Sequence, residues 1–149
     1  MMSLTILLIY LLLIFLGALV IGIQNDISER KSVENQLAFN VSHDVLTGLP
    51  NRTLLEDRLT QGCQFAKRYG RTLGLLFVDL DGFKLINDSM GHRLGDQLLI
   101  DVGQRLKSII RSGDTVARIS GDEFIVVLPD LAQANDVIMI VEKIIHNLS

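Results

Sequence analysis

Adjacent carboxylates are the first feature of this sequence that is capable of chemistry. Asp122 and Glu123 stand beside Gly121, between two apolar runs of β-forming residues at 116–119 and 124–128. This arrangement predicts a β-hairpin, because glycine takes positive φ angles without steric cost. Paired carboxylates at a turn can hold a hard cation, and the bare glycine backbone lets a phosphate approach closely. An ordinary solvated turn is the competing interpretation.

A second acidic group follows the apolar run 73–78, which predicts a strand that is buried on both faces. Asp79 comes directly after this run, where an unsatisfied carboxylate is costly, so Asp79 is a candidate cation ligand. Asp81 is interpreted instead as a cap of the next helix. Gly82 begins a loop whose backbone N–H groups can face a phosphate.

The elements around these acids must hold them in position. Apolar residues at helical spacing predict four helices, at 54–70, 83–88, 98–110 and 131–148. The segment 90–96 is interpreted as a turn. From residue 73 the order is therefore strand, two helices, a hairpin and a helix. A βαββαβ sandwich needs one more strand, so we expect a domain that is incomplete at its C-terminal end and leaves a sheet edge open.

The composition argues against several classes of function. A net charge of −3, with the basic residues dispersed, argues against nucleic acid as a partner. The single cysteine, Cys63, cannot form an internal disulfide, which agrees with a reducing compartment. His43, His92 and His146 lack the spacing of zinc ligands and are interpreted as surface or packing residues.

The N-terminal segment 1–25 is predicted to be a transmembrane helix. Its uncharged apolar run, 4–23, is long enough to cross the hydrocarbon layer of a lipid bilayer. A cleaved signal peptide is the alternative, but no basic residue precedes the run and no small-residue cleavage site follows it. Arg30 and Lys31 follow the run, so the positive-inside tendency predicts a single-pass protein of the inner membrane with the remainder in the cytoplasm.

Two further segments complete the predicted organisation. Residues 26–43 are polar, lack glycine and proline, and carry apolar residues at helical spacing, which indicates a helical linker able to pair with a second copy. Gly48 and Pro50 then interrupt the pattern, which predicts a domain boundary and a domain over 44–149.

Three motifs, in matching order and spacing, resemble the GGDEF domain of bacterial diguanylate cyclases. They are D-V-L-T-G-L-P-N-R at 44–52, D-L-D-G-F-K-L-I-N-D-S-M-G-H-R-L-G-D at 79–96 and R-S-G-D-T-V-A-R-I-S-G-D-E-F at 111–124. The resemblance implies an α+β fold, the ferredoxin-like palm of nucleotide cyclases. It implies a reaction that joins two GTP into cyclic di-GMP with release of two pyrophosphates, in a homodimer whose subunits each present one GTP to the other.

The resemblance also implies roles for the acids. Asp79 and Asp122, with the main-chain carbonyl of Leu80, match the ligands of magnesium, in whose place manganese can serve. Glu123 matches the residue that assists deprotonation of the attacking 3′-hydroxyl, and it can share in metal binding. Gly121 matches the residue that lets the α-phosphate approach the turn.

Other positions match the substrate-binding residues of the family. The N–H groups of Gly82, Phe83 and Lys84 resemble the loop that holds the terminal phosphates. Asn87 and Asp96 match the pair that recognises guanine, in which a carboxylate accepts from N1–H and N2–H and an amide serves the remaining edge.

Arg111 and Asp114 match the R-x-x-D inhibitory site, where the product cyclic di-GMP binds and slows the enzyme. An arginine suits that ligand, because it can clamp a phosphate or a guanine edge with two hydrogen bonds. The alternative for Arg111 is a cation placed at a helix C-terminus, where it interacts with the helix dipole.

The sequence departs from the family pattern in two places. Ser120 replaces the first glycine of the signature, and the last strand of the family domain, with its basic phosphate-binding residues, is not found. We therefore expect this chain to bind magnesium–GTP weakly and to turn over little. A non-catalytic module that responds to nucleotide or mediates dimerisation is the alternative function, and an unrelated membrane-anchored signalling domain is a third.

Overall fold

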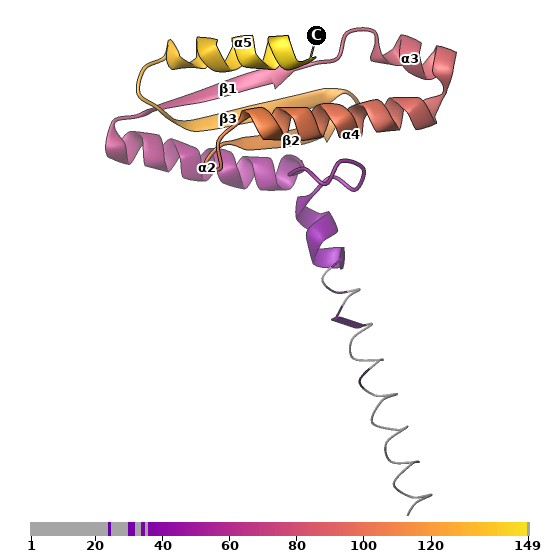
Figure 1. The fold of residues 1–149 in the computed structure, drawn as a ribbon. Helices are drawn as coiled ribbons and strands as arrows, with labels where there is room; N and C mark the ends of the chain where they lie inside the picture. Colours follow the sequence, from indigo (N-terminus) through magenta and orange to yellow (C-terminus); the bar gives the residue numbers. More distant parts are fainter. Residues whose placement is uncertain (1–23, 25–29, 32–33, 35, 149) are drawn as a thin grey trace, which may run out of the picture. The chain divides into compact units, whose positions relative to one another are not determined.

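The computed structural model describes residues 24, 30–31, 34 and 36–148 (Figure 1). Its contacts divide the chain into two units, Met1–Phe39 and Asn40–Ser149. The described residues of the predicted linker are helical as far as Ser42. The predicted membrane span, 4–23, lies outside the described residues. Among the helices that are described, none has both the length and the hydropathy needed to cross a bilayer.

The second unit contains an antiparallel sheet and helices on both of its faces (Figure 1). Its elements, in chain order, are α2 Arg52–Tyr69, β1 Thr72–Val78, α3 Phe83–Met90, α4 His92–Ile109, β2 Thr115–Ser120, β3 Glu123–Leu131 and α5 Asp136–Leu148. This order confirms the predicted succession of strand, two helices, hairpin and helix. The α+β content and the small antiparallel sheet agree with the predicted cyclase palm.

Helix α2 begins and ends at residues with suitable capping chemistry. The side chain of Asn51 accepts a hydrogen bond from the Leu54 backbone N–H at 3.2 Å, which satisfies one of the unpaired donors of the first turn. Gly70 ends the helix in the left-handed conformation, with φ of 63°. The predicted helix is therefore present and begins two residues earlier than expected.

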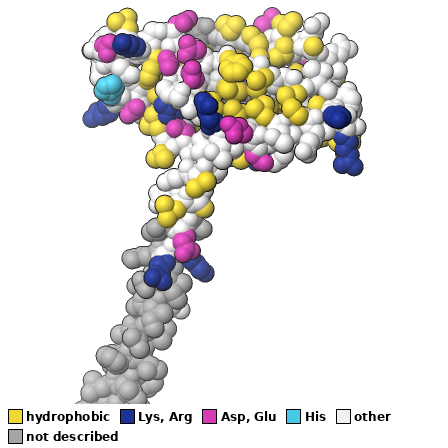
Figure 2. All heavy atoms as spheres, turned by 180° about the vertical axis from the view of Figure 1, so that it is seen from behind, with side chains coloured by type: hydrophobic (Ala, Val, Ile, Leu, Met, Phe, Trp, Pro, Cys, Tyr) yellow, Lys and Arg dark blue, Asp and Glu magenta, His cyan; other side chains and the backbone are white. Residues whose placement is uncertain are grey.

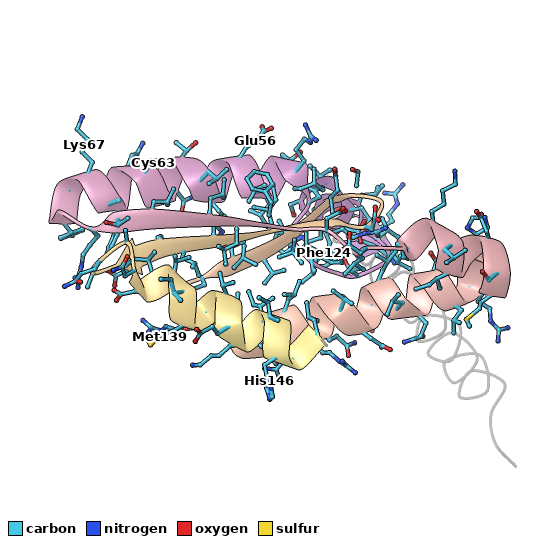
Figure 3. All side chains as sticks on the ribbon, turned by 90° about the horizontal axis from the view of Figure 1, so that it is seen from above. Glu56, Cys63, Lys67, Phe124, Met139 and His146 are labelled. Carbon is cyan, nitrogen blue, oxygen red and sulfur yellow. The ribbon has the colours of Figure 1, made fainter. Side chains whose placement is uncertain are left out.

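Strand β3 is the centre of the sheet, in the order β1-β3-β2. Alternate side chains of β3 point to opposite faces. Phe124, Val126 and Leu128 belong to the core formed with α4 and α5, whereas Ile125 and Val127 belong to a smaller core with α2. The view from above shows α2 on one side of the sheet and α4 and α5 on the other (Figure 3).

The prediction that the first strand is buried on both faces was wrong. Within the described chain β1 pairs with β3 alone and forms an edge of the sheet. Leu75 and Phe77 are 38% and 76% exposed, because on their face of the sheet α2 packs over β3 and Leu73 and leaves these two side chains uncovered. Figure 2 shows hydrophobic side chains gathered on one face of this unit.

Three further predictions about these elements differ from the structure. The segment 90–96 is not a turn, because α4 begins at His92 and Gly91, with φ of 86°, is the single residue between two helices. Pro129 lies inside β3, so the last helix starts at Asp136 rather than at residue 131. Asp81 does not cap α3, whose N-cap is Gly82 without a side-chain hydrogen bond in the described chain.

Candidate active site at the end of the sheet

The sheet brings the two acidic groups to one end. The predicted hairpin is confirmed, with Ser120 paired to Glu123 across the two-residue turn of Gly121 and Asp122. Gly121 has φ of 46°, which a residue with a side chain rarely adopts. On the other side of β3, Val78 of β1 pairs with Phe124. Asp79 therefore leaves β1 at the end of the sheet where Glu123 begins β3.

An arginine that the sequence analysis did not single out holds the turn. Arg118 donates from Nε and Nη2 to the carbonyl oxygen of Gly121, at 2.9 and 2.8 Å. Its Nη1 forms a salt bridge with Asp44 Oδ1 at 2.9 Å, and the two side chains are 11% and 24% exposed. The motif at 44–52 is thus attached to a turn more than 70 residues later. The signal available in the sequence was the presence of both residues inside family motifs.

Asp44 is itself held in an ionised form. Its carboxylate accepts hydrogen bonds from the backbone N–H of Thr47 at 2.9 Å and from the Thr47 hydroxyl at 2.7 Å. Burial raises the pKa of Asp44, but the hydrogen bonds from Thr47 and the attraction of Arg118 outweigh it. The net pKa is therefore below the ordinary value of 3.8.

The donor set at this end of the sheet fits a cation that binds together with a substrate. Among the described residues, no three His, Cys, Asp or Glu side chains are grouped closely enough to form a metal site of their own. Two carboxylates, Asp79 and Asp122, suit magnesium, which binds through one or two carboxylates and completes its shell with phosphate and water. The Leu80 carbonyl accepts from the Phe83 N–H at 3.1 Å and keeps a second lone pair for an ion.

Asn87 of α3 and Asp96 of α4 lie on consecutive helices, on either side of the Gly91 link. Gly91 reverses the chain between the helices, and its N–H donates to the Asn87 carbonyl at 2.9 Å. Asn87 is half-buried and Asp96 is exposed. The Asn87 side-chain oxygen is buried without a hydrogen-bond partner in the described structure.

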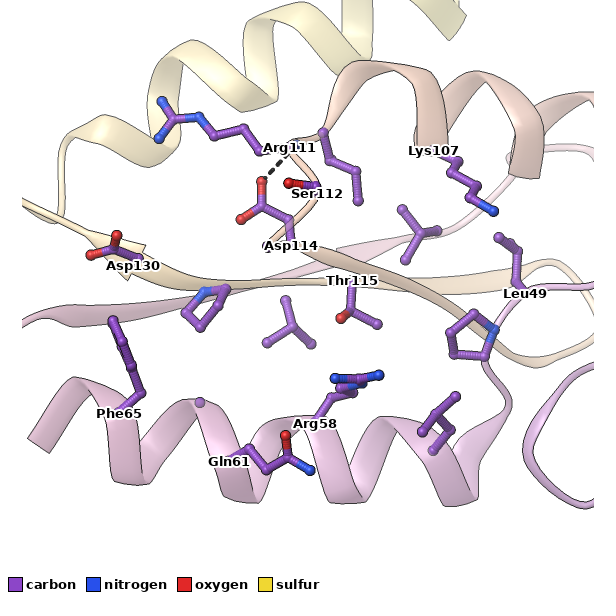
Figure 4. Close-up of a pocket in the computed structure, with 18 of the residues that line it drawn as sticks. Leu49, Arg58, Gln61, Phe65, Lys107, Arg111, Ser112, Asp114, Thr115 and Asp130 are labelled. Atoms are coloured by element: carbon purple, nitrogen blue, oxygen red, sulfur yellow. Dashed lines mark hydrogen bonds between the residues drawn. The ribbon is translucent and has the colours of Figure 1, made fainter. Parts of the chain in front are cut away.

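Arg111 and Asp114 form a local turn between α4 and β2. The Asp114 carboxylate accepts from the Arg111 backbone N–H at 3.0 Å, and the Asp114 N–H donates to the Arg111 carbonyl at 3.0 Å. This turn borders a cavity of about 780 Å³, which Arg58 enters from α2 and Lys107 from α4. The Arg111 side chain points away from α2 toward α5 (Figure 4), where it lines a second cavity of about 390 Å³.

The antiparallel sheet between helices, with acids at the end of β1 and at the β2–β3 turn, agrees with the palm of nucleotide cyclases. Residues 41–149 match the family described as "Diguanylate cyclase, GGDEF domain", and the chain belongs to this family.

Named relatives carry the same domain. The chain is 48% identical over 107 residues to the bifunctional diguanylate cyclase/cyclic di-GMP phosphodiesterase MucR of Pseudomonas aeruginosa, covering 72% of this chain and 16% of MucR. It is 42% identical over 112 residues to the diguanylate cyclase TpbB of the same species, covering 75% of this chain and 26% of TpbB. The chain thus spans about a quarter or less of the length of these curated relatives.

Solved structures support the fold directly. The GGDEF domain of TpbB superposes with a TM-score of 0.68 at 43% identity, over 70% of this chain and 61% of that chain. The coiled coil and GGDEF domain of DgcB from Caulobacter crescentus, in complex with c-di-GMP, gives a TM-score of 0.69 at 28% identity, over 87% of this chain and 67% of that one.

Proposed function

We propose that this chain is a diguanylate cyclase, which condenses two GTP into cyclic di-GMP and releases two pyrophosphates. The observation that carries the proposal is the register of the sheet. Pairing of Val78 with Phe124 directs Asp79 to the end of the sheet that also carries Asp122 and Glu123. Family membership supplies the reaction class.

Asp79 and Asp122, with the Leu80 carbonyl, are proposed to hold magnesium or manganese. When bound, such an ion neutralises charge on the transferring phosphate. Glu123 accepts the proton of the attacking 3′-hydroxyl, as the 3′-oxygen forms its bond to the α-phosphorus of the second GTP and pyrophosphate leaves. Gly121 keeps the turn free of a side chain, so the α-phosphate can approach the backbone.

The α3–α4 pair is the proposed guanine site. Asp96 accepts hydrogen bonds from guanine N1–H and N2–H, and the amide of Asn87 serves the remaining edge. Gly82, Phe83 and Lys84 are the proposed residues for the terminal phosphates. The Phe83 N–H already donates to Leu80, so Gly82 and Lys84 carry more of this role.

The regulatory and assembly features extend this proposal. Arg111 and Asp114 are proposed to bind cyclic di-GMP and slow the enzyme. The structure of the relative DgcB in complex with c-di-GMP supports this ligand for the domain, and the R-x-x-D resemblance supports these residues. We further propose a homodimer, in which each subunit presents one GTP to the other. Anchoring in the cytoplasmic membrane through 4–23, with the domain in the cytoplasm, rests on the sequence pattern.

The test of the proposed activity is direct. The 149-residue chain is incubated in detergent with GTP and magnesium, and pyrophosphate and cyclic dinucleotide are measured together. We expect slow formation of two pyrophosphates for each cyclic di-GMP, and no formation after chelation of the metal. Saturable binding of GTP without any pyrophosphate would refute the cyclase assignment.

A non-catalytic nucleotide-responsive module is the second candidate. It is favoured by one contact, in which the Ser120 hydroxyl donates to Glu123 Oε2 at 2.7 Å and so engages one oxygen of the proposed proton acceptor. Replacement of Ser120 by glycine frees that oxygen. If Ser120→Gly produces cyclic di-GMP where the unsubstituted chain produces none, the serine is what distinguishes the inactive module from the enzyme.

A further inference from the structure

Gly95 occupies an unusual place in α4. It is buried in the fourth position of the helix, and its φ is not among the positive values that require glycine. Glycine is destabilising in a helix interior relative to alanine. Glycine is therefore needed at position 95 because a side chain would not fit there, and not because of the backbone conformation.

The space is filled by Asn87. A Cβ added to Gly95 would overlap with Asn87 Oδ1, and it would lie 3.0 Å from Asn87 Cγ and 3.3 Å from Phe83 Cε2. The side-chain oxygen of Asn87 thus rests against the bare α-carbon of Gly95. An α-carbon with two hydrogens can make weak C–H···O contacts, which suits a carbonyl oxygen at this position.

The position of the oxygen determines which atom of the amide faces outward. Oδ1 is buried and lacks a hydrogen-bond partner in the described structure, whereas Nδ2 lies farther from the Gly95 position than Oδ1 and Cγ do. Asn87 as a whole remains half-buried at the end of α3. The amide therefore presents a donor, not an acceptor, to a ligand beside Asp96.

We propose that Gly95 is a positioning residue for base recognition: its bare α-carbon holds Asn87 Oδ1 and so directs Nδ2 to donate to O6 and N7 of guanine. Asp96, the next residue, accepts from N1–H and N2–H of the same base. This inference rests on the proposed function, since it names how the guanine site distinguishes its ligand. It assigns the O6 edge to Asn87 and the N2 edge to Asp96.

A double-mutant cycle in thermal unfolding tests the contact without any ligand. Gly95→Ala is expected to lower the melting temperature in the unsubstituted chain, because the methyl group displaces Asn87. In an Asn87→Ala background the same change is expected to lower the melting temperature much less, because the overlap with the amide is gone and only the 3.3 Å contact with Phe83 Cε2 remains. Gly103→Ala is the matched control on α4, since its Cβ would meet Leu49 and not Asn87. Its effect is expected to be equal in both backgrounds.

Nucleotide analogues then test the direction of the amide. Equilibrium binding is measured for GTP, ATP, 6-thio-GTP, whose sulfur is a weaker acceptor at position 6, and ITP, which lacks the N2 amino group. The unsubstituted chain is expected to bind GTP about tenfold more tightly than either guanine analogue. Gly95→Ala is expected to lose the discrimination against 6-thio-GTP and to keep that against ITP, and Gly103→Ala is expected to keep both.

The outcomes separate this inference from the proposed function. If GTP binds in preference to ATP and Gly95→Ala still discriminates against 6-thio-GTP, the positioning role is refuted while the guanine site stands. If the unsubstituted chain has no preference for GTP over ATP, the guanine site is refuted and this inference with it. An equal effect of Gly95→Ala in both unfolding backgrounds would also overturn the inference.

Discussion

The turns at the two ends of β2 are held in different ways. The Gly121 turn is fixed by Arg118, which also reaches Asp44 through a salt bridge whose side chains are largely buried. The Arg111–Asp114 turn is closed by hydrogen bonds between residues three apart, and Arg111 is exposed. The turn that carries the proposed chemistry is thus attached to a distant part of the chain. The turn that carries the proposed regulation is held by local hydrogen bonds alone among those described.

The largest effect is expected at the first turn. Asp122→Asn should reduce cyclic di-GMP formation about hundredfold or more, because an amide is a poorer partner for a cation than a carboxylate. Asp79→Asn should do the same, and both variants should keep the melting temperature of the unsubstituted chain. Asp88→Asn, an exposed aspartate on α3, is the matched control. Normal turnover in either active-site variant would contradict the assignment of the metal ligands.

The next largest effect is expected at Arg118, which attaches the Gly121 turn to Asp44. Arg118→Ala should lower the free energy of unfolding by about 1–3 kcal/mol, because it leaves the half-buried Asp44 carboxylate and the Gly121 carbonyl without their donors. Arg71→Ala removes another salt bridge of equal length, 2.9 Å to Asp130, whose side chains are 43% and 53% exposed. That control should cost about 0–1 kcal/mol. Equal losses in urea unfolding would remove the distinction between the two pairs.

The stability that the Asp44–Arg118 salt bridge contributes should depend on pH. The pKa of Asp44 is lower in the folded state than in the unfolded chain, so the unfolded state binds more protons as the pH falls. The stability that Asp44 contributes is therefore complete above its unfolded value of 3.8 and is lost as the pH falls through its folded pKa. The unfolding midpoint of Asp44→Asn should therefore fall less than that of the unsubstituted chain as the pH is lowered below 3.8. An unchanged pH profile in this variant would show that Asp44 is not linked to acid unfolding.

The smallest effect on stability is expected at the second turn. Arg111→Ala should change the free energy of unfolding by less than about 0.5 kcal/mol, as is usual for an exposed side chain. It should nevertheless relieve the slowing of turnover by added cyclic di-GMP, measured from initial rates. Retained inhibition in Arg111→Ala would favour a role for this cation at the end of α4, as a partner of the helix dipole.

The sequence allowed prediction of features that depend on local chemistry. Gly121 between two apolar runs indicated the hairpin, and the apolar periodicity of α2 and α4 indicated amphipathic helices. Features that depend on distant contacts were not accessible. The pairing of Arg118 with Asp44 joins residues far apart in the chain, and nothing in the types of Leu75 and Phe77 shows that β1 lies at an edge.

The candidate site also contains features that the sequence predicted and features that depend on contacts between elements. The residue types identified Asp79, Asp122 and Glu123 as capable of metal and proton chemistry. The polar segment around His92 looked like a turn, because a single glycine suffices to reverse the chain and the start of α4 is polar. As a result, the contact between Gly95 and Asn87 was missed, since it exists only when both helices are in place.

The single-residue link at Gly91 sets the rotational phase of α4 relative to α3. Each residue of an α-helix turns the side-chain direction by about 100°, so an insertion between His92 and Arg93 would rotate the rest of α4 by that angle. Gly95 would then no longer face Asn87, and Asp96 would move to another side of the helix. The number of residues between Asn87 and Asp96 therefore has to stay constant. Insertion or deletion of one residue in this segment is expected to impair the proposed guanine site more than most substitutions do.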